Sequence, residues 1–163
     1  MAASAIIAVL EKLLTLHQDL YDIAKRKTII IKYGELEALN QVMKDENKII
    51  VAIQLAEKER EKAILLLSKG DPVRGTPSTI LECLDWIDEK SDQEKIVELR
   101  SMLLDTIEVL KDINNLNQQL LEQSMQFVRL NLDLFSPESN LDNYSKTANE
   151  ESETIRSFFD SKA

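Results

Sequence analysis

The sequence contains one histidine, His17, and histidine is a residue type that often supports catalysis. A histidine phosphotransfer domain is a helical bundle with one reactive histidine, and its site needs nearby basic residues for the phosphoryl group. Asp19 and Asp22 follow His17 instead, and their carboxylates would repel a phosphoryl group. Histidine is also common at intermediate burial. We therefore expect His17 to pack or hydrogen-bond beside the apolar face of a helix, and phosphotransfer is a third hypothesis.

The only cysteine, Cys83, lies beside Glu82 and Asp85. Acidic neighbours raise the pKa of a thiol, so we expect Cys83 to be unreactive. One cysteine excludes an internal disulfide and a cysteine-rich zinc site. The acidic residues around it lack the glycine and the spacing of an EF-hand loop, and no glycine-rich phosphate-binding loop occurs. The residues predict a protein that is not an enzyme and binds no metal or cofactor.

The most informative surface lies in residues 113–135, where the polar positions are mostly amides. From Ile113 to Leu132 only Glu122 and Arg129 are charged. The amides are Asn114, Asn115, Asn117, Gln118, Gln119, Gln123, Gln126 and Asn131. Burying a charge costs more free energy than burying an amide that finds a hydrogen-bond partner. Neutral polar positions therefore suit a helix that is covered by a partner protein, by other helices of this chain, or by both.

Apolar residues in the same stretch form two stripes. Both follow helical spacing, and they lie roughly 130° apart at about 100° per residue. The first stripe comprises Leu121, Met125, Val128, Leu132 and Phe135, and the second comprises Leu116, Leu120, Phe127, Leu130 and Leu134. A helix in a bundle needs one apolar stripe to face its neighbours. We therefore predict that these ten residues form a client-binding surface, and we do not assign the client to one stripe.

The elements that position this surface are predicted to be long helices. The chain has 163 residues with 3 Gly and 3 Pro, so few positions interrupt a helix. Residues 4–33 and 35–68 should form an antiparallel hairpin, with Gly34 in the left-handed conformation between them. The apolar face of the first helix comprises Ile6, Val9, Leu10, Leu13, Leu16, Leu20, Ile23, Ala24 and Ile31.

The second half of the predicted bundle contains a short helix and a long one. Two glycines and a proline place a loop at residues 70–75. A short third helix over 77–89 should follow, with Thr76 as its N-cap. The run Ser91–Glu94 matches a capping box and predicts that a long fourth helix starts near residue 92 and ends near 135. The predicted fold class is therefore an all-α antiparallel helical bundle.

After residue 135 the composition becomes polar and acidic. Residues 136–163 contain too few apolar groups to collapse alone, so we expect a helical domain over 1–135 and a flexible acidic tail over 136–163. Apolar residues in the tail include Tyr144 and a small island near its end formed by Ile155, Phe158 and Phe159. We treat Tyr144, Phe158 and Phe159 as partner-docking candidates, with an inert tail as the alternative.

The formal net charge is -9, which argues against binding to nucleic acid or to an anionic membrane through bulk charge. No run of apolar residues approaches the roughly 20 that cross a bilayer, and the N-terminus lacks the pattern of a signal peptide. A cytoplasmic protein with protein partners is the expectation from charge and cysteine content.

Several short motifs resemble those of one known family. Asn114, Asn117, Leu120 and Leu121 follow an Asn-x-x-Asn-x-x-Leu-Leu pattern, and an apolar-aromatic stretch follows it. The tail segments Asn143-Tyr144-Ser145-Lys146 and Phe159-Asp160-Ser161-Lys162-Ala163 add to the likeness. With the length, acidity and helix order, they make the chain resemble FlgN-type flagellar export chaperones, in particular the YvyG-like branch. The likeness spans nearly the whole chain.

The resemblance implies a function in flagellar assembly. Proteins of this family bind hook-associated (hook–filament junction) proteins through their terminal helices and prevent premature association. They deliver these clients to the flagellar type III export gate, and a C-terminal stretch contacts the gate or the client. The alternative is a coiled-coil assembly or scaffold protein that self-associates through the late-helix stripe. The oligomeric state and the identity of the client stay open.

Overall fold

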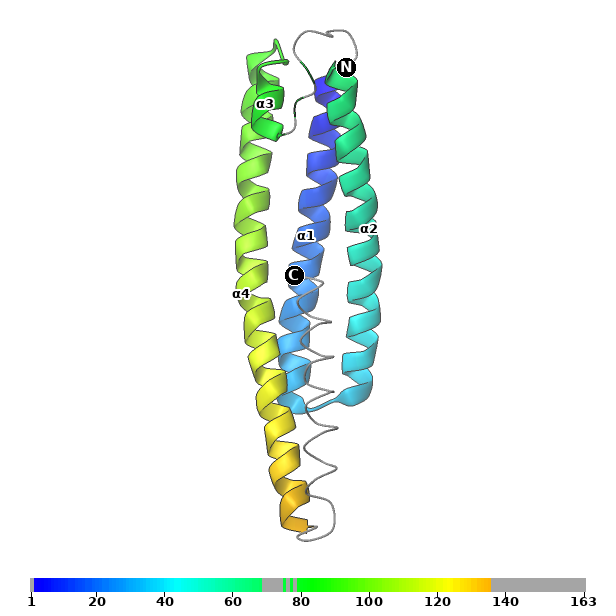
Figure 1. The fold of residues 1–163 in the computed structure, drawn as a ribbon, viewed down its shortest axis with the longest axis vertical. Coiled ribbons are helices and arrows are strands. Elements are labelled where there is room, and N and C mark those ends of the chain that lie inside the picture. Colours follow the sequence, from blue (N-terminus) through cyan, green and yellow to red (C-terminus); the bar gives the residue numbers. More distant parts are fainter. Residues whose placement is uncertain (1, 69–74, 76, 78, 136–163) are drawn as a thin grey trace. The chain divides into compact units, whose positions relative to one another are not determined.

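The computed structural model describes residues 2–68, 75, 77 and 79–135. This part of the chain is helical, and no strand occurs in it (Figure 1). The helices are α1 (Ala2–Tyr33), α2 (Leu36–Ser68), α3 (Ile80–Leu84) and α4 (Lys90–Phe135). The predicted all-α helical bundle, with an N-terminal hairpin, a short third helix and a long fourth helix, is confirmed. The predicted tail lies outside the described residues.

The turn between α1 and α2 is closed by Gly34, as predicted. Gly34 has φ +69°, a left-handed conformation that costs glycine little. Its N–H donates to the carbonyl of Ile31 at 3.2 Å, and the N–H of Glu35 donates to the carbonyl of Ile30 at 3.4 Å. These two bonds are the Schellman pattern, which satisfies carbonyls that a helix end leaves unpaired. The hairpin therefore ends sharply at this point.

The prediction for the third helix was wrong in extent. Helix α3 has only five residues, and its N-cap is Thr79, whose side chain accepts from the backbone N–H of Glu82 at 3.2 Å. Thr76, the predicted N-cap, lies outside the described residues. The helix ends at Leu84, and the N–H groups of Trp86 and Ile87 then donate to the carbonyls of Cys83 and Leu84 in tighter turns, at 3.1 and 3.2 Å. The side chain of Gln93, from α4, donates to the carbonyls of Leu84 and Ile87 at 3.2 and 2.6 Å.

Helix α4 starts at Lys90, slightly before the predicted residue 92. The N–H groups of Asp92 and Gln93 both donate to the carbonyl of Glu89 at 3.1 Å, so the first helical turn begins there. The Ser91–Glu94 run therefore lies inside the helix. The helix continues without interruption to Phe135, where Ser136 and Pro137 follow in the sequence.

The contacts divide the chain into two compact units, and each is described separately. Unit 1 comprises Met1–Asp22 and Asp45–Leu110. Its apolar core consists of Ile6, Leu10, Leu14, Ala63, Ile64, Cys83, Ile87, Ile96 and Leu99. At its surface Lys12 pairs with Glu59 at 2.9 Å, and Lys95 pairs with Glu11 at 2.8 Å. Both ion pairs are half-exposed, so the apolar core supplies most of the stability of this unit.

Unit 2 comprises Ile23–Lys44 and, among the described residues, positions 111–135. It contains the end of α1, the Gly34 turn, the start of α2 and the late part of α4. Its buried residues are Ile23, Ala24, Lys27, Ile31, Val42 and Asn117. This unit holds all ten residues of the predicted client-binding surface.

Most of the predicted apolar face of α1 is buried. The exception is Leu16, which is half-buried, while its neighbour Leu14 is buried. Lys27, only 1% exposed, is also buried on this helix and was not predicted. In the described part of the chain no buried side-chain nitrogen or oxygen lacks a hydrogen-bond partner, so the buried polar groups are satisfied.

Replacing Gly34 with alanine should lower the free energy of unfolding by about 1–2 kcal/mol, the cost of the left-handed conformation for a residue with a Cβ atom. A Cβ built at Gly34 meets no atom within 4 Å, so the cost is conformational and not steric. Urea denaturation followed by circular dichroism measures the change. The control Ser101→Ala, at an exposed position of α4, should stay within about 0.5 kcal/mol. An unchanged Gly34→Ala variant would contradict this turn geometry.

Candidate partner-binding surface

One hydrogen-bonded side chain sets the position of α4 along α1 in unit 2. Asn117 has no exposed surface, and its amide donates to the carbonyl of Ala24 at 3.0 Å. The hydroxyl of Thr28 donates to the amide oxygen of Asn117 at 2.5 Å. Asn117 therefore lies level with residues 24–28 of α1. At this position an amide of the stretch is thus covered by another helix of the chain, one of the alternatives that the sequence left open.

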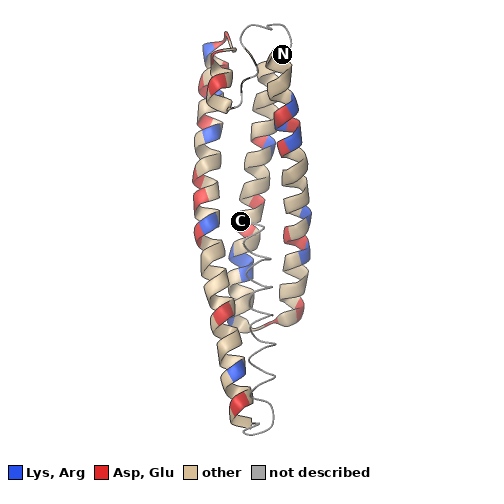
Figure 2. Ribbon diagram, in the orientation of Figure 1, with Lys and Arg blue, Asp and Glu red and all other residues tan. Residues whose placement is uncertain are grey.

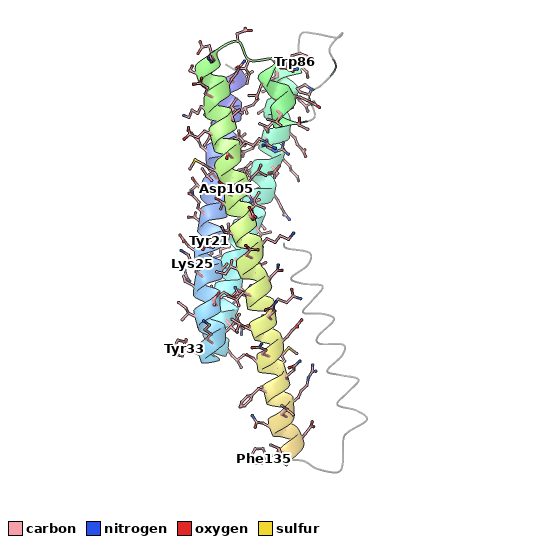
Figure 3. All side chains as sticks on the ribbon, turned by 90° about the vertical axis from the view of Figure 1, so that its left-hand side faces the viewer. Tyr21, Lys25, Tyr33, Trp86, Asp105 and Phe135 are labelled. Carbon is pink, nitrogen blue, oxygen red and sulfur yellow. The ribbon has the colours of Figure 1, made fainter. Side chains whose placement is uncertain are left out.

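In this register the last turns of α4 have no described helix beside them. Helix α1 ends at Tyr33, which lies level with about residues 122–126 of α4 at one residue per 1.5 Å. The remaining ten or so residues of α4 extend roughly 15 Å past the Gly34 turn. Figures 1 and 3 show this end of α4 beyond the α1–α2 turn, with Phe135 at its tip. We call residues 127–135 the overhang.

The ten predicted residues differ in exposure along α4. Leu120, Leu121 and Met125 are half-buried. The other seven are exposed, from 42% at Leu132 to 87% at Phe135, and they are Leu116, Phe127, Val128, Leu130, Leu132, Leu134 and Phe135. Both stripes contribute exposed residues, because the overhang has no described helix on either side. The structure therefore leaves neither stripe covered by another described helix in these last turns.

Two further apolar side chains lie at the same end of unit 2. Tyr33 is 77% exposed and Leu36 is 75% exposed, one on each side of the Gly34 turn. Figure 3 shows Tyr33 at the end of α1, near the level at which the overhang of α4 begins. Sequence reasoning missed both residues because it assigned helix ends only a capping role. Large apolar residues next to a C′ glycine were the available signal.

The amides and charges fit this exposed surface. Asn115, Gln119, Gln123 and Gln126 are exposed, and Glu122, Arg129 and Asp133 are the only charged residues in 113–135. Figure 2 shows how sparse charged residues are on this part of α4. A partner that covers this surface would therefore desolvate few charges, which lowers the cost of burial.

His17 and Cys83, the two residues considered for chemistry, each make a hydrogen bond within the protein. His17 is half-buried, and its Nδ1 lies 2.7 Å from the carbonyl oxygen of Leu13, to which it donates. The expected hydrogen-bonding histidine is confirmed. The thiol of Cys83 is buried in the core of unit 1 and donates to the carbonyl of Thr79 at 3.2 Å. Burial raises the pKa of this thiol, and the Glu82 carboxylate adds to the effect.

The expected direction for the Cys83 pKa is confirmed, but burial rather than acidic neighbours is the larger cause. In the described part of the chain no group of three or more His, Cys, Asp or Glu residues is arranged to hold a metal ion. None of the described helices combines the length and apolar character that crossing a membrane requires.

Replacing Asn117 with alanine should lower the free energy of unfolding by about 1–3 kcal/mol, because it removes two buried hydrogen bonds and leaves the Thr28 hydroxyl without this acceptor. The matched control is Asn115→Ala, an exposed amide two positions away, which should change stability by less than about 0.5 kcal/mol. A cycle with Thr28→Val should give a coupling energy above about 0.5 kcal/mol. Additive changes in that cycle would show that the two side chains do not interact.

Comparisons with known proteins place the chain in one family. The FlgN protein family matches residues 1–152, a span that contains all four described helices. The Bacillus subtilis (strain 168) protein named "Uncharacterized protein YvyG" is 32% identical over 168 residues, and the alignment covers 100% of both proteins. No solved structure matches the chain.

The family match covers most of the chain, and the relative aligns along its full length. Both agree with the resemblance drawn from the Asn114–Leu121 pattern and the tail motifs. The chain belongs to the FlgN family, and this membership supports a general function as a flagellar export chaperone.

Proposed function

We propose that this chaperone binds hook-associated proteins in the cytoplasm through the late part of α4. In this proposal it keeps their terminal helices from premature association and delivers them to the flagellar type III export gate. The single observation that supports the binding surface is the overhang, an apolar helix end with no described neighbour. Family membership supports the class of client but does not identify it.

The overhang is suited to an amphipathic helix of the client. An amphipathic partner helix packs on such a surface through apolar residues at its positions i, i+3, i+4 and i+7. A client helix can pack along the overhang without displacing α1 or α2, because α1 ends and α2 begins at the Gly34 turn. Tyr33 and Leu36 would extend the contact onto the hairpin.

The expected affinity is moderate. A terminal segment that orders on binding loses conformational freedom, and this loss takes several kcal/mol from the gross interaction energy. A carrier must release its client at the export gate, so a reversible complex suits the function. Tyr144, Phe158 and Phe159 are proposed contacts for the gate or the client, and they lie outside the described residues.

Two double variants would test the surface and separate its stripes. Met125→Asp with Val128→Asp alters the first stripe, and Phe127→Asp with Leu134→Asp alters the second. The pair that faces the client should weaken binding to a purified hook-associated protein by roughly 30-fold or more, the effect of losing about 2 kcal/mol at a binding hot spot. Isothermal titration calorimetry measures the affinity.

The control for these variants is Val97→Asp with Leu104→Asp, which adds the same two negative charges at exposed apolar positions of α4 in unit 1. It should bind the client like the wild type. Circular dichroism should show that all variants stay helical. If both double variants bind with wild-type affinity, the proposed surface is wrong.

The second candidate is a scaffold that self-associates, because an exposed apolar stripe also fits a second copy of this chain. Light scattering separates the two functions. A monomer that forms a 1:1 complex with the client supports the chaperone. A stable oligomer that persists on dilution, and that both double variants dissociate, would support the scaffold instead.

A further inference from the structure

The overhang has a candidate occupant within the same chain. We propose that the tail island, Ile155, Phe158 and Phe159, docks on the overhang of α4 when no client is bound. Its consequence for client binding rests on the proposed function, whereas the docking itself is a property of the free chain. The occupant is intramolecular, so the empty chaperone would cover its own binding surface.

The first argument is the apolar surface itself. Phe127, Leu134 and Phe135 are 66%, 77% and 87% exposed within the last nine residues of α4. Contiguous exposed apolar surface of this kind marks a binding site or an aggregation hazard. Covering it with a segment of the same molecule removes the hazard without blocking the site permanently.

The second argument is reach. The tail starts directly after Phe135, and Ile155 follows about 20 residues later. About 20 residues span at most roughly 66–72 Å when fully extended. The overhang is roughly 15 Å long at 1.5 Å per residue, so the island can return to it without being stretched. A tether of this length gives an effective concentration in the millimolar range.

The third argument is composition. The island contains two adjacent phenylalanines in a segment that is otherwise almost entirely polar. Its apolar residues recur at positions 155, 158 and 159, a spacing that places them on one face if the segment forms a helical turn. The island therefore has the chemistry of a short amphipathic segment, which is the chemistry that an apolar helix surface selects.

Charge complementarity supports the same occupant. Glu150, Glu151 and Glu153 come just before the island. In unit 2 residues 23–44 carry five basic and two acidic side chains. The exposed Lys32 lies near the end of α1, while Lys25 and Arg26 already have interactions within the chain. Opposite charges on the two segments favour their encounter, and salt should weaken this contribution.

The docked tail would compete with the client. When a binding surface is free for only a fraction of the time, the apparent affinity falls by that fraction. If the island covers the overhang nine-tenths of the time, the client binds about tenfold more weakly than it would to an uncovered surface. A client that succeeds in binding releases the tail, so the tail would report whether the chaperone is loaded.

Hydrogen–deuterium exchange on the full chain tests the docking. The test variant is Phe158→Ser with Phe159→Ser, and the control is Leu141→Ser, an apolar tail residue outside the island. The backbone amides of residues 127–135 should exchange several-fold faster in the test variant than in the wild type or the control. Added salt should speed the exchange in the wild type. The wild-type protection should not depend on protein concentration.

Equal exchange in the wild type and the test variant would overturn the docking. Protection that grows with protein concentration would also overturn it, because a second copy would then be the occupant. A titration with a hook-associated protein tests the competition. The test variant should bind about tenfold more tightly if the two phenylalanines act as the cover, whereas weaker binding would assign them to the client contact and overturn the competition. Equal affinities would overturn the competition. If no client binds either protein, the proposed function fails, while the exchange experiment still decides the docking.

Discussion

The buried hydrogen bonds of Asn117 fix the register between α1 and α4, and this register determines which part of α4 lies beyond the hairpin. Apolar side chains alone would tolerate a slip of α4 by one turn, about 5.4 Å, because leucines recur at similar positions along it. A slip would leave the buried Asn117 amide without its partners, at a cost of about 1–3 kcal/mol, whereas the Thr28 hydroxyl could still donate to the carbonyl of Ala24 at 3.1 Å. A single polar residue in an apolar interface can thus specify one alignment, as buried asparagines do in coiled coils.

The other constraint is the Gly34 turn, which ends the hairpin abruptly. The Schellman bonds from Gly34 and Glu35 satisfy the carbonyls of Ile31 and Ile30, so α1 ends here and does not continue alongside α4. Together the glycine and the asparagine define the overhang. One decides where α1 stops and the other decides which residue of α4 lies at that level.

The fold was largely predictable because its main signals are local. Gly34, the helical period of the apolar residues and the scarcity of helix breakers predicted α1, α2 and α4. The extent of the third helix was not predictable, since the residues after Leu84 form turns whose carbonyls bond to Gln93 of α4, a contact that periodicity does not encode. Burial was predicted less well at particular residues. Leu14 and Leu16 both lie near the apolar face of α1, and only packing against other helices decides which of them is buried. The burial of Lys27 also depends on tertiary contacts that no periodicity encodes.

For the candidate site, the two stripes were visible in the sequence, but the reason for their exposure was not. Periodicity indicated one stripe more than a helix in a bundle needs, and it left open whether the second stripe faces another element of this chain or a partner. In the overhang both stripes are exposed, because the neighbouring helix has ended.

This exposed apolar surface raises the question of how the protein avoids self-association. A molecule of net charge -9 resists association through repulsion, yet residues 113–135 carry few of those charges. The least protected surface is therefore also the most apolar one. A chaperone that exposes such a surface permanently would associate with itself or with unrelated proteins. A chaperone that covers it with its own tail would still bind a client whose affinity is high enough to displace the tail. The physical requirement is a cover that is weak and tethered, and in the proposed docking the tail that follows α4 in the sequence would supply it.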